Sequence, residues 1–122
     1  MTVLREQSPQ RGEIWWIHFA FDAPGKNRPA VIVSIDARNR HPRVNVFLAI
    51  PLSTSIHKSA STHLLLRAGE TGLREDSVAW AENLTTVTHD QLVALVEGQR
   101  PLTNTQICRL ASLVKAAMGC IE

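Results

Sequence analysis

The chain has 122 residues, of which 44% are hydrophobic and 20% charged, with a formal net charge of +2 at pH 7. This length suits one domain, and the composition excludes both a disordered chain and a membrane-spanning one. We therefore expect a single domain over residues 1–122, in which residues 1–10 form a flexible N-terminal extension.

The N-terminal segment and the cysteines favour a cytoplasmic protein without a metal ion. MTVLREQSPQRGE lacks the apolar stretch of a secretory signal, and the longest apolar runs are far shorter than a membrane span. Cys108 and Cys120 would lie about 18 Å apart along one helix, too far for a disulfide. With no Cys-x-x-Cys pair and five scattered histidines, we expect neither a metal ion nor a cofactor.

Positive charge is concentrated in the first part of the chain. Residues 1–50 hold seven Lys/Arg against four Asp/Glu, a balance of +3, whereas residues 51–122 hold six against seven, a balance of −1. The basic side chains of interest are Lys26, Arg28, Arg38, Arg40 and Arg43. Such an excess is most often a solvated positive face, so charge alone leaves an anionic partner open.

Short strands dominate the first two thirds of the chain. Aromatic and β-branched residues predict strands over residues 14–21, 30–35, 44–50, 62–66 and 77–81, and residues 92–97 suit a strand or a helix. DARNRHP, residues 36–42, predicts a hairpin turn, and AGETGLRED, residues 68–76, another turn.

The last segment predicts an amphipathic helix. Thr103 and Gln106 have capping-box spacing, and Gly119 would end the helix. Its expected apolar stripe consists of Ile107, Leu110, Ala111, Val114, Ala117 and Met118. A weaker box, Thr88 with Gln91, predicts one helical turn in THDQL. Five or six short strands with one helix indicate a mainly β, partly open barrel, covered by the helix on one side.

The stretch GKNRPAVIVS, residues 25–34, sets Arg28 at the entrance of an apolar strand. Pro29 disfavours helix at position 28 and fixes its own backbone dihedral, so Arg28 is anchored on rigid backbone. Its forked guanidinium donors suit a phosphate or a carboxylate. The alternative is an ordinary surface ion pair.

Hydroxyl side chains follow the third predicted strand. Pro51 is expected to end the strand pairing, and Ser53, Thr54 and Ser55 come after it. Such residues more often hydrogen-bond their own backbone in a turn, and they can also orient an oxyanion.

One carboxylate and the tryptophans are further candidates. The two-residue alternation of a strand puts Trp80 and Glu82 on one face, where Glu82 is either a general base or a polar rim residue. Trp15 and Trp16 point to opposite faces, so one of them is either exposed to stack an unpaired base or buried in the core or a subunit interface.

Four segments together resemble the MazF/PemK family of toxin endoribonucleases. They are RGEIWWIHF at 11–19, GKNRPAVIVS at 25–34, AIPLSTS at 49–55 and DSVAWAENLTTV at 76–87, and the resemblance covers about residues 10–119. It implies a small SH3-like barrel with a C-terminal helix, of the CcdB/MazF-like type, that forms homodimers. It also implies metal-independent cleavage of single-stranded RNA and neutralisation by a cognate antitoxin, expected to use an acidic, partly disordered segment.

The resemblance also implies site residues. Arg28 would bind the scissile phosphate, Ser53 or Thr54 would donate a hydrogen bond to it, and Glu82, with a pKa raised beside Trp80, would be the general base. The RNA-binding positions would be Lys26, Asn27, Trp16, Arg38, Arg40, Arg43, Trp80 and Asn83. The expected products are a 2′,3′-cyclic phosphate and a 5′-hydroxyl, and DNA, which lacks the 2′-hydroxyl nucleophile, should not be cut.

Two departures and two alternatives accompany this resemblance. FDAPG, residues 21–25, shortens the loop that carries a histidine in the PemK branch, and Trp80 stands where that branch can have arginine. One alternative is a gyrase-inhibiting toxin on the same fold, whose Trp-Gly-Ile ending this chain lacks. The other is an RNA-binding barrel that does not cleave.

Overall fold

The computed structural model describes residues 8–56 and 60–120, so most of the predicted extension over residues 1–10 lies outside the described residues. The described strands are β1 (Ile14–Ile17), β2 (Arg28–Ile32), β3 (Val46–Ser53), β4 (His63–Leu66), β5 (Ser77–Trp80), β6 (Thr85–Thr88) and β7 (Leu92–Leu95). The helices are α1 (Asp36–Asn39), α2 (Ala68–Thr71) and α3 (Asn104–Ala117), with 3₁₀ turns η3 (Ala81–Asn83) and η4 (His89–Gln91). Within the described residues, no helix is long and apolar enough to cross a membrane.

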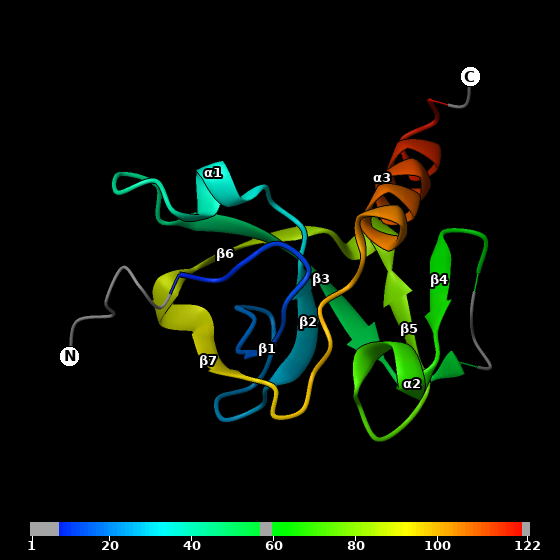
Figure 1. Ribbon diagram of the computed structural model, residues 1–122, viewed down its shortest axis with the longest axis horizontal. Helices are drawn as coiled ribbons and strands as arrows, with labels where there is room; N and C mark the ends of the chain where they lie inside the picture. The colour runs from blue at the N-terminus through cyan, green and yellow to red at the C-terminus, as the bar shows by residue number, and fades with distance from the viewer. Residues whose placement is uncertain (1–7, 57–59, 121–122) are drawn as a thin grey trace.

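The strands form one antiparallel sheet in the order β4-β5-β3-β2-β1-β7, and β6 pairs with β3. The long strand β3 pairs with β6 through Val46–Ala49 and with β5 only from Leu52 onward. It therefore belongs both to the curled part of the sheet and to the smaller part formed with β4 and β5, which lie to the right in Figure 1. The path does not close on itself within the described residues, which confirms the predicted partly open barrel.

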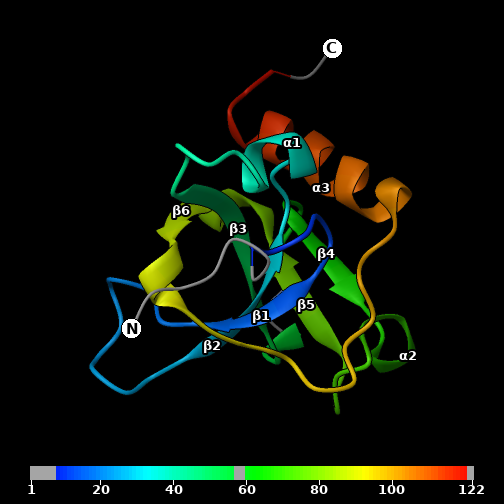
Figure 2. The same ribbon diagram turned by 60° about the vertical axis from the view of Figure 1, so that its left-hand side comes forward.

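Buried apolar residues form two clusters, because successive side chains of β2 and β3 point to opposite faces of the sheet. The barrel cluster includes Ala30, Ile32 and Phe47. The helix cluster includes Val31, Ile50, Leu52, Leu66, Leu110 and Leu113. Figures 1 and 2 show α3 lying over β4 and β5, so the helix covers one side of the sheet as predicted.

Both ends of α3 follow the sequence. Thr103 Oγ1 accepts a hydrogen bond from the backbone N–H of Gln106, and Gln106 Oε1 accepts one from Thr103 N–H. At the other end Gly119, at φ 88°, ends the helix as expected.

The predicted apolar stripe of α3 is partly wrong. Ile107 and Leu110 are buried as expected, and Leu113, which the stripe omitted, is buried too. Ala117 and Met118 are exposed because the last turn of α3 extends past the sheet, as Figure 1 shows. Ala111 is exposed as well, although the later Leu113 is buried, and it lines a surface cavity with Leu110 and Val114.

Three turn and strand predictions need correction. Residues 36–39 form the short helix α1 instead of a hairpin turn, because the buried side chain of Asn39 donates to the carbonyl oxygen of Ser34. Residues 68–71 form α2 within the predicted turn. Pro51 does not end the strand pairing, since β3 continues to Ser53. Pro51 is tolerated inside β3 because it lies where the neighbour changes from β6 to β5.

Residues 88–97 form the predicted helical turn and then the strand β7. THDQL contains η4 with its Thr88–Gln91 capping box, and Leu92–Leu95 is a strand. β6, which the sequence analysis did not single out, completes the set of described strands.

Replacing Gly72 with alanine will destabilise the fold by about 3 kcal/mol or more. Gly72 has φ +80°, and a Cβ there would lie 2.1 Å from the carbonyl oxygen of Gly98. Gly25→Ala is the matched control, because φ there is +84° but no atom lies within 4 Å of the added Cβ. We expect only about 1 kcal/mol for Gly25→Ala in urea denaturation, and equal losses in the two variants would contradict the steric argument.

Candidate functional site

Strand pairing brings Arg28 and Ser53 together. Ala30 pairs with Pro51 and Val31 with Ile50 in antiparallel register, and continuing this register sets Arg28 opposite Ser53. Residues opposite each other in a sheet share a face, so both side chains point to the same side. They line one pocket of about 90 Å³, which we call the arginine pocket; its lining residues are Phe21, Arg28, Pro51, Leu52, Ser53, Trp80 and Asn83.

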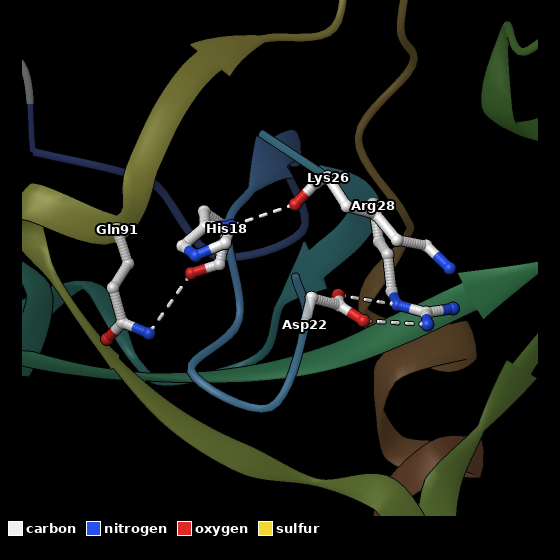
Figure 3. Close-up of polar contacts among 5 residues, drawn as sticks. All are labelled: His18, Asp22, Lys26, Arg28 and Gln91. Carbon is white, nitrogen blue, oxygen red and sulfur yellow. Dashed lines mark hydrogen bonds and ion pairs between the residues drawn. The ribbon is translucent and has the colours of Figure 1, made fainter. Parts of the chain in front are cut away.

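Arg28 is held on one edge by Asp22, from the loop between β1 and β2 (Figure 3). Nε donates to Asp22 Oδ2 at 2.8 Å and Nη2 donates to Oδ1 at 2.9 Å, so the contact is bidentate. The Arg28 hydrogen bond lowers the pKa of the Asp22 carboxyl, and the same bond raises the pKa of Arg28. The Arg28 guanidinium carbon also lies 5.7 Å from the ring centre of Phe21. Arg28 therefore forms an ion pair, which was the alternative interpretation of this residue from the sequence, and it also lines a pocket.

Ser53 keeps one hydrogen-bond donor for a ligand. Its Oγ accepts a hydrogen bond from the backbone N–H of Ser55 at 3.1 Å. This is the contact with nearby backbone in a turn that the sequence analysis gave as the commoner role of such hydroxyls. Because Oγ is the acceptor, the hydroxyl hydrogen is left to donate. Thr54 instead lines a second cavity of about 340 Å³ with Trp16 and Pro29. The geometry thus favours Ser53 over Thr54 as the hydroxyl beside Arg28.

The prediction of a raised pKa for Glu82 is wrong. Burial pushes the pKa of Glu82 upward, but hydrogen bonds from His63 and Thr62 outweigh it, and the net pKa lies below the usual value. Glu82 Oε1 accepts from Thr62 Oγ1, and Oε2 accepts from His63 Nε2, each at 2.8 Å. Glu82 also does not share a strand face with Trp80, because β5 ends at Trp80 and Glu82 lies in η3.

His63 connects Glu82 to Trp80. The backbone N–H of Ala60 donates to His63 Nδ1 at 2.9 Å, so Nε2 carries the hydrogen that Glu82 accepts. The imidazole stacks on the Trp80 indole, with ring centres 5.3 Å apart and planes 9° apart. These contacts hold Trp80 at the wall of the arginine pocket.

The structure divides the predicted RNA-binding residues into groups. Trp80 and Asn83 line the arginine pocket, and Lys26 and Asn27 are exposed on the loop that leads into Arg28. Trp16 is exposed and lines the second cavity with Thr54, whereas Trp15 packs against the barrel cluster.

The basic segment Arg38, Arg40 and Arg43 is not part of this site. Arg38 Nε donates to the carbonyl oxygen of Val46, the first residue of β3, whereas Ser53 is its last. At ~3.3 Å per residue the two ends are roughly 23 Å apart. Figure 1 shows α1, which carries Arg38, on the opposite side of the barrel from the β1–β2 loop. The expectation that this segment holds phosphates next to the scissile one is therefore not supported.

Sequence reasoning missed Asp22, Phe21 and His63. Ile17 pairs with Arg28, so the ten residues between them must fold back as a loop beside the arginine. The FDAPG turn in that loop was the available signal for Asp22. No comparable signal marked His63, which reaches Glu82 only because β4 pairs with β5.

Residues 10–117 match the family model described as the PemK-like, MazF-like toxin of type II toxin–antitoxin systems. The chain therefore belongs to this toxin family. It is 33% identical over 114 residues to "Endoribonuclease MazF9" of Mycobacterium tuberculosis, an alignment covering 88% of this chain and 91% of that protein.

Solved structures agree with the fold. An endoribonuclease in complex with its cognate antitoxin, from a mycobacterial species, is similar with a TM-score of 0.72 and 22% identity, covering 93% of this chain and 98% of that one. MazF from Deinococcus radiodurans gives a TM-score of 0.71 with 18% identity, covering 92% of this chain and 97% of that one. The SH3-like, CcdB/MazF-like architecture expected from the resemblance is thereby confirmed as the fold of this family member.

Proposed function

We propose that this PemK/MazF-family toxin is an endoribonuclease that cuts single-stranded RNA without a metal ion or cofactor. The observation that carries the proposal is the arginine pocket, where a fixed guanidinium and a hydroxyl donor face one cavity from paired strands. Its relative MazF9 is an endoribonuclease by name. RNA supplies its own nucleophile, so the protein needs only to orient and stabilise the reacting phosphate.

In the proposed reaction the 2′-hydroxyl oxygen attacks the adjacent phosphorus and the bond to the 5′-oxygen breaks. The 2′-hydroxyl gives up a proton and the departing 5′-oxygen gains one. The Arg28 edge not held by Asp22 binds a non-bridging oxygen, where negative charge increases in the transition state. Ser53 donates its hydroxyl hydrogen to the same phosphate. The products are a 2′,3′-cyclic phosphate and a 5′-hydroxyl, and a DNA strand has no nucleophile for this step.

Replacing Glu82 with glutamine will leave the cleavage rate within about 3-fold of wild type, because the carboxylate is occupied by Thr62 and His63. Losing a general base would instead cost roughly 10²- to 10⁴-fold. Single-turnover rates of the two proteins on one RNA distinguish these outcomes. A loss of more than 100-fold, with an unchanged melting temperature, would restore Glu82 as the base.

The partners belong to the same proposal. Exposed apolar side chains on β7, Val93 and Leu95, favour a homodimer. For the cognate antitoxin we propose an acidic, partly disordered segment that competes with RNA for the exposed part of Arg28 and for Lys26. Structures similar in fold include a complex with a cognate antitoxin. The site of action is the cytoplasm, where RNA is available.

The test is incubation of the purified protein with single-stranded RNA in excess EDTA. We expect cleavage, with cyclic phosphate and 5′-hydroxyl ends, and no cleavage of the same RNA carrying one 2′-deoxy nucleotide at the mapped cut. Intact RNA from the wild-type protein would exclude the nuclease. Binding without cleavage would support the non-cleaving RNA-binding barrel, and inhibition of gyrase supercoiling without either would support the gyrase toxin.

A further inference from the structure

We infer that Asp22 is a positioning residue for RNA cleavage, which holds the Arg28 guanidinium so that its remaining edge faces the phosphate. This inference rests on the proposed nuclease activity. It assigns a role to the short FDAPG loop, which departs from the family pattern.

The contact leaves a defined part of Arg28 for a ligand. Asp22 takes Nε and one hydrogen of Nη2. The second Nη2 hydrogen and the two on Nη1 remain, and no group among residues 8–56 and 60–120 hydrogen-bonds Nη1. A planar guanidinium fixed along one edge cannot rotate, so these three donors keep one direction. Because an arginine side chain otherwise has many rotamers, this restraint reduces the entropy lost when phosphate binds.

Asp22 is a fixed support and not a plug over the pocket. Its side chain is 5% exposed, whereas that of Arg28 is 34% exposed, so an incoming phosphate reaches the arginine first. The backbone N–H of Asp22 donates to the carbonyl oxygen of Phe19 at 3.0 Å. Just before Asp22 in the chain, the rings of Phe19 and Phe21 stack on each other with centres 5.1 Å apart.

The loop that carries Asp22 is held by one hydrogen bond across its base and by another to η4, as Figure 3 shows. His18 Nδ1 donates to the carbonyl oxygen of Lys26 at 2.8 Å, which closes the loop at its base. Gln91 Nε2 donates to the carbonyl oxygen of His18 at 3.2 Å and joins the loop to η4. These ties hold the carboxylate in place when the arginine binds a ligand.

A positioning carboxylate has opposite effects on binding and on rate. Its negative charge partly cancels the positive charge of Arg28 and repels RNA, so removing it should strengthen RNA binding. The freed guanidinium should then be misaligned in the transition state, so removing the carboxylate should also slow the reaction. A residue that serves only stability would not separate the two quantities in this way.

The experiment compares wild type with Asp22→Asn. We expect kcat to fall about 10- to 100-fold, while the Kd for RNA with a 2′-deoxy nucleotide at the cut falls about 2- to 5-fold. Asp76→Asn is the matched control, because Asp76 also pairs with an arginine, Arg67 at 3.1 Å, outside the arginine pocket. It should leave kcat and Kd unchanged.

A second variant, Asp22→Glu, covers the case in which the asparagine variant does not fold. It keeps the charge but displaces the guanidinium, so we expect a lower kcat with no gain in RNA affinity. An unchanged or higher kcat in folded Asp22→Asn would overturn the inference, the higher value indicating that Asp22 obstructs the pocket. If the wild-type protein does not cleave RNA, the proposed function itself is wrong. The wild-type measurement in the same experiment therefore distinguishes a failure of the proposed function from a failure of this inference.

Discussion

Replacing Arg28 with alanine will slow RNA cleavage by about 10³-fold or more, the largest effect that we expect in this protein. The side chain combines the positive charge and the fixed donors of the arginine pocket. Its loss also leaves Asp22, whose side chain is 5% exposed, without its cation and directed at the phosphate. Single-turnover cleavage of one labelled RNA measures the effect.

Arg28→Lys separates charge from geometry. Lysine retains the charge but cannot make the bidentate contact with Asp22 while presenting forked donors to phosphate. We expect a loss of about 10²-fold, with RNA affinity close to wild type. Arg67→Ala is the control, because Arg67 also pairs with an aspartate, Asp76. The Arg67 side chain is 67% exposed. Full activity of Arg28→Ala would remove the basis for the proposed mechanism.

Replacing Ser53 with alanine will slow cleavage by about 10²-fold, close to the cost of removing one preorganised donor to a developing oxyanion. Ser53 lies in the arginine pocket and has a hydroxyl hydrogen to donate. Thr54→Ala is the matched control, because Thr54 is the next residue yet lines the other cavity. We expect less than a 5-fold loss for Thr54→Ala in the same assay.

The reverse order of effects would identify Thr54 as the acting hydroxyl and would mean that RNA crosses the strand end toward the second cavity. Ser53→Thr gives a further check. It keeps the hydroxyl and adds the methyl group found in most of the family, so activity should stay within about 10-fold of wild type.

The main elements could be predicted because their causes are local. The Thr103–Gln106 capping box and the turn after α3 act within a few residues, and the structure has both. The Thr88–Gln91 box likewise produced η4. The end of the apolar stripe on α3 was wrong because periodicity does not say where the sheet beneath a helix stops. Pro51 was misjudged because its tolerance depends on which neighbour β3 has at that point.

In the candidate site, too, only the features with local causes could be predicted from the sequence. The restriction that Pro29 places on Arg28 follows from sterics between adjacent residues, so its rigid mounting at a strand entrance could be inferred. The resemblance placed the hydroxyls but left Ser53 and Thr54 equivalent. Ser53 and Thr54 line two different cavities because successive side chains along a strand point to opposite faces. Only the structure shows that β3 reaches as far as Ser53.

The sequence by itself determined a small, partly open β-barrel with an arginine at a strand entrance, because steric restriction, capping and apolar alternation act between near neighbours. That the protein is a toxin followed from its resemblance to the MazF/PemK family. Only the tertiary structure decided what surrounds that arginine. The Asp22–Arg28 pair requires the hairpin to close, and the Glu82–His63 contact joins residues 19 apart in sequence. Ion pairs and pKa shifts depend on distances of a few ångströms between side chains, and those distances are set by strand pairing and loop folding, not by spacing along the chain.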